Sequence, residues 1–159
     1  MSLHSAGTPI VLSKSEAAKC GLSRFCTGRE CRFGHFAERY VSNGQCVVCN
    51  AERARAREQL RGQLEPSYRM FRNTLRRTGM ALRGRASPSM ALACDHDRLR
   101  EHVSARFRDG MNWESYRQWE VDHVEPLSAA RSPQELFELC HYTNLQPLWR
   151  RENRIKGGA

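Results

Sequence analysis

Long apolar runs are missing from this sequence. Its 159 residues are 40% hydrophobic, and nowhere do they form the stretch of about 20 apolar residues that a membrane-spanning helix needs. The segment from Met1 to Ser15 also lacks a basic stretch followed by an apolar one, which argues against a secretory signal. We therefore expect a protein of the cytosol with no membrane partner, and we expect residues 1 to about 15 to be disordered.

Acidic residues and lysine are both scarce. The chain has 17 Asp and Glu against 26 Lys and Arg, which gives a formal net charge of +9, and lysine occurs only at Lys14, Lys19 and Lys156. The planar fork of arginine suits phosphate because it donates two parallel hydrogen bonds. This balance favours a nucleic-acid partner, although a solvated arginine-rich surface would have the same composition.

The number of cysteines is odd, so they cannot all pair with one another. Seven cysteines without an export signal argue against a disulfide framework and favour reduced thiols or metal ligation. Cys31 and His35 form a C-x3-H pair, and Cys46 and Cys49 form a C-x2-C pair further along. Two such pairs supply the four donors of a tetrahedral structural Zn²⁺ site. We predict this site at these four residues, with Cys26 as the alternative to His35.

The chain divides by composition into three parts: a zinc-binding module at 1–50, an Arg-rich helical connector at 51–92 and a third part at 93–159. Good helix formers predict helices over 49–62 and from Ser67 onward. The basic helices would either lie along DNA phosphates or form a solvated connector.

The third part carries the most informative segments. A short strand in WEVDHVEPLS, residues 119–128, ends in Asp122-His123. In CHYTNLQPLWRRENRIKGG, residues 140–158, an extended piece from Asn144 to Leu148 precedes a polar helix at 149–156. The predicted order is strand, loop, strand, helix.

These segments resemble the ββα-metal motif of HNH endonucleases, in the form whose last metal ligand is asparagine. The phrase HYTNLQPLW followed by EN is similar to phage and prophage HNH proteins, and CRFGH…ERYVSNGQCVVC resembles a zinc-binding segment of phage recombination endonucleases. The resemblance implies an α+β fold with a ββα-metal nuclease domain at 93–159, acting on DNA in the cytoplasm of a bacterial host. The chain departs from many HNH proteins at Trp149 and Glu152, where cysteines would help to bind a second zinc.

The resemblance also implies roles for individual residues. Asp122 and Asn153 would bind one Mg²⁺ (or Mn²⁺) ion, because these cations prefer hard oxygen donors. His123 would be the general base that activates water, and Asn144 would tie down the loop and orient His123. Four basic residues of the last helix would hold the DNA backbone: Arg150, Arg151, Arg154 and Lys156.

Two alternatives stay open. A zinc-stabilised DNA-binding module without cleavage activity would fit the charge, but binding alone has no need of His123 beside a metal ligand. Cys94 and Cys140 have histidines near them in sequence and are candidates for a second metal site, although buried thiols fit their spacing better; Cys20 is also unassigned. A double-strand cut at a symmetric site would suit a homodimer.

Overall fold

Helices dominate the fold, and two small antiparallel sheets accompany them. The computed structural model describes residues 10–157 and divides the chain into two compact units, Met1–Leu60 (unit 1) and Arg61–Ala159 (unit 2). Each unit contains one of the two-stranded sheets, so the predicted α+β class is confirmed. None of the helices within residues 10–157 combines the length and the apolar character needed to cross a membrane.

Unit 1 is built from short elements followed by a long helix. In chain order these are α1 (Lys14–Lys19), β1 (Arg24–Phe25), β2 (Arg39–Tyr40) and α2 (Val47–Leu64), whose last residues enter unit 2. Helix α1 begins in a capping box, in which the Ser13 hydroxyl accepts from the Glu16 backbone and the Glu16 carboxylate accepts from the Ser13 N–H. The expected disorder through residue 15 is therefore wrong for the start of α1, whereas residues 1–9 lie outside the described residues.

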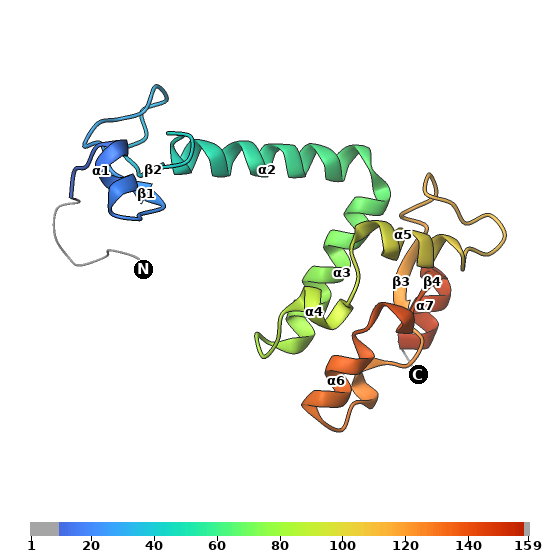
Figure 1. Ribbon diagram of the computed structural model, residues 1–159. Coiled ribbons are helices and arrows are strands. Elements are labelled where there is room, and N and C mark those ends of the chain that lie inside the picture. The colour runs from blue at the N-terminus through green and yellow to red at the C-terminus, as the bar shows by residue number, and fades with distance from the viewer. Residues whose placement is uncertain (1–9, 158–159) are drawn as a thin grey trace. The chain divides into compact units, whose positions relative to one another are not determined.

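Unit 2 contains a hairpin that is followed at once by a helix (Figure 1). Its elements are α3 (Pro66–Leu82), α4 (Pro88–Leu92), α5 (His96–Ser104), β3 (Trp119–His123), α6 (Pro133–Leu139), β4 (Leu145–Trp149) and α7 (Arg150–Gly157). Strands β3 and β4 are antiparallel, with Asp122 opposite Gln146 and His123 opposite Leu145. The strand, loop, strand and helix predicted from the sequence are all present at its C-terminal end.

The core of unit 2 joins helix α3 to this hairpin. Met70 of α3, Leu99 of α5, Trp119 of β3 and Leu145 of β4 are almost completely buried in one cluster. Edge-to-face contacts with several aromatic rings surround Trp119, among them Phe107 at 5.1 Å between ring centroids. Because large aromatic side chains contribute most to core packing, the hairpin is held firmly against α3 and α5.

A buried histidine also connects α5 to the hairpin. His102 is 9% exposed, and its Nε2 lies 2.9 Å from the carbonyl oxygen of Leu145. Burial lowers the pKa of His102, the Leu145 carbonyl raises it, and the charges of Arg106 and Arg98 lower it further, with a net fall below the ordinary value. The folded protein therefore holds His102 in its neutral form at a pH where the unfolded chain already binds a proton.

Acidification is expected to destabilise unit 2 through this histidine. The contribution of His102 is fully present above its unfolded pKa of about 6.5 and is lost as the pH falls towards the lowered folded value. The midpoint of urea unfolding should therefore fall less between pH 7 and 5 in His102→Gln, which keeps a donor for Leu145, than in the wild type. Tryptophan fluorescence reports this transition, because Trp113, Trp119 and Trp149 all lie in unit 2. Parallel pH profiles of the two proteins would contradict the assignment.

Candidate functional site

The predicted zinc ligands lie together in unit 1. The ligand atoms of Cys31, His35, Cys46 and Cys49 are all within 4.8 Å of one another. The Sγ of Cys31 is 3.6 Å from the Sγ of Cys49, and Nδ1 of His35 is 3.2 Å from the same Cys49 sulfur. Three sulfurs and one imidazole nitrogen at these separations are able to hold one metal ion such as zinc.

Local backbone geometry brings the four residues together. In the turn at Cys31, the Gly34 N–H donates to the Cys31 carbonyl at 2.9 Å and the Phe33 N–H donates to the Cys31 sulfur at 3.4 Å. Gly34 has a φ of +80°, which is the left-handed conformation that glycine adopts without steric cost. Cys46 directly precedes α2 and Cys49 lies in its first turn, so the helix fixes the second pair.

His35 belongs to this cluster and Cys26 does not. Cys26 is buried and bridges to Val11 in a separate backbone pairing, so the alternative ligand set falls away. The second ring nitrogen of His35, Nε2, lies 3.5 Å from a carboxylate oxygen of Glu52 on α2. A carboxylate on that nitrogen orients the imidazole and leaves Nδ1 for the metal.

The pKa values of two thiols in the cluster, Cys31 and Cys49, are shifted in opposite directions. Burial, together with the thiols of Cys31 and Cys46, raises the pKa of Cys49 to about 11. Burial also acts to raise the pKa of Cys31, but hydrogen bonds from the backbone of Phe33 and His35 outweigh it and lower this pKa to about 6. The Cys49 thiol therefore stays protonated near neutral pH, and a bound divalent ion would favour its thiolate form.

The remaining cysteines take no part in a comparable group. Within residues 10–157, the Cys31 cluster is the one place where three or more His, Cys, Asp or Glu ligands gather. Cys140 is fully buried in unit 2, and burial raises the pKa of Cys94 to about 11. Cys20 is exposed. The second metal site that the sequence left open thus finds no support, and Cys94 and Cys140 are packed thiols.

In unit 2, one side of the hairpin faces α7 with its acidic side chains. Lys156 Nζ donates to Asp122 Oδ2 at 2.6 Å, to the carbonyl oxygen of His123 and to that of Val124 at 3.1 Å. Asn153 Nδ2 donates to Glu120 Oε2 at 2.9 Å. The two predicted oxygen ligands, Asp122 and Asn153, therefore both lie between β3 and α7, but in this structure they bind Lys156 and Glu120.

Glu120 is a further member of this group, to which the sequence analysis gave no role. Its carboxylate accepts from Asn153 and also pairs with Arg150, whose Nε lies 3.0 Å from Oε1. The signal was available in the alternation of the strand, because residues 120 and 122 project from the same face. The Glu120 carboxylate, two residues before Asp122, therefore faces the same helix, α7.

Within residues 10–157, one imidazole nitrogen of His123 has no hydrogen-bond partner. Its Nε2 is buried and has no hydrogen-bond partner among the described residues, which is uncommon for a buried polar atom. Burial lowers the pKa of His123, the charges of Arg77 and Lys156 lower it further, and Asp122 opposes them. At neutral pH the ring is therefore neutral, with a nitrogen that is chemically able to accept a proton.

Asn144 fastens the chain immediately after His123. Its Oδ1 accepts from the Glu125 N–H at 2.9 Å, while its Nδ2 donates to the carbonyls of Glu125 at 3.0 Å and Leu139 at 2.8 Å. Its own carbonyl accepts from the Val124 N–H at 2.7 Å. The Asn144 side chain thus ties down the loop that follows His123.

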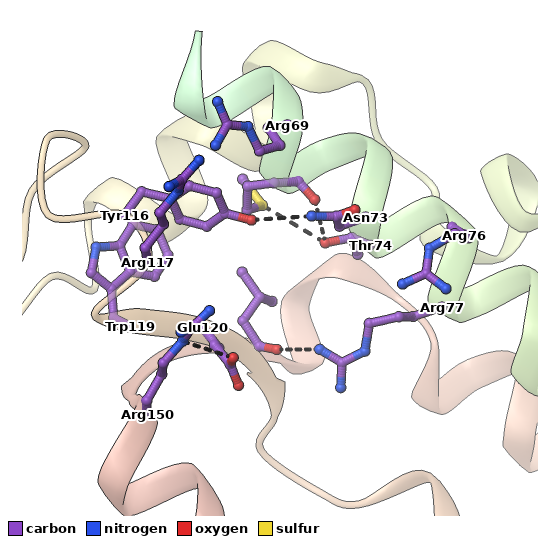
Figure 2. A pocket seen from close by; sticks show the side chains of 12 residues that line it. Arg69, Asn73, Thr74, Arg76, Arg77, Tyr116, Arg117, Trp119, Glu120 and Arg150 are labelled. Carbon is purple, nitrogen blue, oxygen red and sulfur yellow. Dashed lines mark hydrogen bonds and ion pairs between the residues drawn. The ribbon is translucent and has the colours of Figure 1, made fainter. Parts of the chain in front are cut away.

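The basic residues of α7 differ in what they bind. Arg150 and Lys156 are engaged by Glu120 and Asp122, whereas Arg151 and Arg154 are exposed. A larger arginine group, part of which lies on one of the basic helices predicted from the sequence, lines a cleft of about 580 Å³ beside β3 (Figure 2). Three of its members are Arg69, Arg76 and Arg77, whose spacing of seven and eight residues puts them on one side of a helix.

The chain was compared with protein-family models, with curated proteins and with solved structures, and none of them matched.

Proposed function

We propose that the chain is a divalent-metal-dependent DNA endonuclease that hydrolyses phosphodiester bonds by a one-metal HNH mechanism. One observation carries the proposal: Asp122 directly precedes His123 at the end of β3, and the buried Nε2 of His123 has no partner among the described residues. A neutral imidazole with a free nitrogen is able to accept a proton from an attacking water, and a carboxylate is able to hold a divalent ion. In this proposal, β3, β4 and α7 form the ββα-metal fold.

The space between β3 and α7 favours a cation. The Lys156 ammonium is surrounded by Asp122 Oδ2 and by the carbonyl oxygens of His123 and Val124, so the local field already stabilises positive charge. Asp122 and Asn153 would hold Mg²⁺ or Mn²⁺ there through oxygen atoms, with the ammonium giving up its contact with Asp122. When bound, the ion would stabilise negative charge on the attacked phosphate and on the leaving oxygen.

The residues of the chain divide the remaining work among them. His123 accepts the proton of the attacking water at Nε2, and Asn144 keeps the loop after His123 in place so that the ring stays oriented. Arg151 and Arg154 are exposed on α7 and available to phosphate. Such contacts hold the DNA without reading its sequence.

Zinc in unit 1 would have a structural role in this scheme, because four protein donors leave no open position for substrate.

We further propose a phage or prophage origin and a bacterial cytoplasm as the place of action. Both rest on the resemblance of residues 119–128 and 140–158 to phage and prophage HNH proteins, and of residues 31–49 to a zinc-binding segment of phage recombination endonucleases.

A second candidate function is DNA binding without cleavage. The ion pair between Lys156 and Asp122, at 2.6 Å, favours it, because an ammonium that stays on this carboxylate would compete with a divalent ion. The two candidates share a DNA partner and differ only in whether Asp122 becomes a metal ligand.

Supercoiled plasmid tests the proposed function directly. Incubation with the full chain should give nicked or linear DNA in Mg²⁺ or Mn²⁺ and none in EDTA. The Asp122→Asn variant, which keeps the side-chain shape and removes the charge, should need a higher ion concentration for the same rate. Binding without cutting in every ion would instead favour the second candidate.

A further inference from the structure

An arginine cleft opens in unit 2 between α3 and β3, and the proposed hydrolysis does not account for it (Figure 2). Its volume is about 580 Å³, and Glu120 is its one acidic lining residue. Five of its lining residues are arginines: Arg69, Arg76, Arg77, Arg117 and Arg150. A concave surface with this excess of positive charge concentrates anions from solution.

Most of this charge is uncompensated. Arg150 pairs with Glu120 at 3.0 Å, but Arg77 donates to the carbonyl oxygen of Val121 at 3.0 Å and Arg69 donates to that of Gly62 at 2.8 Å. Carbonyl oxygens orient a guanidinium without cancelling its charge. Within the described part of the chain, no ion pair joins a carboxylate to Arg69, Arg76, Arg77 or Arg117.

The spacing of these arginines indicates an extended ligand. Arg69 and Arg76 are separated by about two turns of α3, or roughly 10 Å along its axis. A single small anion does not reach both ends of such a row, whereas a strand with a phosphate on every nucleotide does. Arg117 lines the cleft from the loop before β3, with a φ of +131° that side chains rarely adopt.

The cleft lies along the strand that ends in His123. Trp119 and Val121 line the cleft, and strand alternation puts His123 on the same face of β3. The contact of Arg77 with the Val121 carbonyl ties the nearest guanidinium to the strand just before His123. A phosphate chain bound by the arginines would therefore continue towards the proposed general base.

We infer that this cleft binds consecutive phosphates of a DNA strand and leads that strand along β3 to His123. The direction towards His123 rests on the proposed endonuclease function, whereas the binding itself does not. A phosphodiester chain fits better than an acidic protein segment, because its charges are evenly spaced and arginine forks match phosphate oxygens.

Binding measured in EDTA tests the cleft separately from cleavage. Fluorescence anisotropy with a labelled duplex, and with one of its strands alone, would compare wild type with Arg76→Gln/Arg117→Gln. The matched control, Arg100→Gln/Arg131→Gln, removes two exposed arginines of unit 2 that do not line the cleft. With both DNA forms, the cleft variant should bind about 10- to 100-fold more weakly at 0.1 M salt, with a salt slope shallower by about 2. The control should change the affinity much less.

A single variant guards against misfolding as the cause. Arg117→Gly removes one guanidinium and accepts the positive φ, so it should weaken binding without lowering the thermal midpoint.

Equal losses in the two double variants, an unchanged salt slope, or equally strong competition by polyglutamate would overturn the cleft assignment. If plasmid is cut but both double variants bind DNA equally, the cleft is wrong and the nuclease stands. If nothing is cut but the cleft variant alone loses affinity, the nuclease is wrong and the cleft stands.

Discussion

Replacing His123 by alanine is expected to lower the rate of metal-dependent plasmid cleavage by about 10²–10⁴-fold, the range that a positioned general base contributes. The structure gives a reason to expect little other damage. The Nε2 atom of His123 has no hydrogen-bond partner in the described part of the chain, so its removal leaves no partner unsatisfied there. The measurement is the initial rate of nicking at saturating Mg²⁺, with protein in excess over DNA.

His141→Ala is the matched control for this variant. His141 lies in the loop before β4, where its Nδ1 is 2.8 Å from the Thr143 hydroxyl, and it has no part in the proposed chemistry. It should cut at close to the wild-type rate. DNA affinity in EDTA should be similar for wild type, His123→Ala and His141→Ala, because the base acts on water and does not hold the phosphate backbone.

The alternatives give different patterns. Similar cutting by His123→Ala and wild type would remove His123 from the mechanism, even if cleavage still needs the metal. Loss of DNA binding together with cutting would show that His123 supports the fold, and a fall in the tryptophan-reported unfolding midpoint would confirm that cause.

Much of the hairpin was predictable because local rules determine it. Alternation from Trp119 to His123 predicted β3, and the polar run after Trp149 predicted α7. The clustering of Cys31, His35, Cys46 and Cys49 was predictable for a similar reason, since two short-spaced pairs are typical of a site that could hold one metal ion. In each case the residues that meet are close in sequence or share one dominant constraint.

Contacts between distant segments were harder to predict. Nothing local indicates that Lys156 binds Asp122 or that Asn153 binds Glu120, because both depend on the angle at which α7 leaves β4. Helix α6 was also missed, although Ser132 accepts from the Glu135 N–H and Pro133 occupies the first turn. These are ordinary helix-start signals, but they lie between the two predicted strands, where only a loop was expected.

The arginine cleft was hard to predict for the same reason, because it is formed by segments that are distant in the sequence. The side of α3 that carries Arg69 and Arg76 was visible in the spacing of the helix. That Arg117 lines the same cleft was not visible in the sequence. The reason is that the aromatic cluster around Trp119 sets how the loop before β3 packs. Charge that seemed to be spread over several helices therefore gathers in one concave site.

Removal of the proposed zinc ion is expected to unfold unit 1 and to leave unit 2 folded. Within the described part of unit 1, the buried apolar residues are few: Ala17, Phe25, Cys26, Cys46 and Cys49. Two of these are cluster cysteines, so the apolar core is too small to offset the conformational entropy of the chain. Structural zinc contributes about 10–16 kcal/mol to comparable small modules, which makes the ion the main source of stability.

Limited proteolysis of the full chain measures this effect. Trypsin should cut rapidly between Arg24 and Arg39 after chelation or in Cys49→Ser, whereas the zinc-loaded wild type and Cys20→Ser, at an exposed cysteine outside the cluster, should resist. Tryptophan fluorescence should not change, because it reports unit 2. Glu52→Gln should weaken zinc binding by about 10- to 100-fold without abolishing it, since it loosens the orientation of His35 and keeps all four ligands. If the chelated wild type resists trypsin as well as the zinc-loaded protein does, unit 1 folds without the ion, and the cysteine cluster needs another explanation.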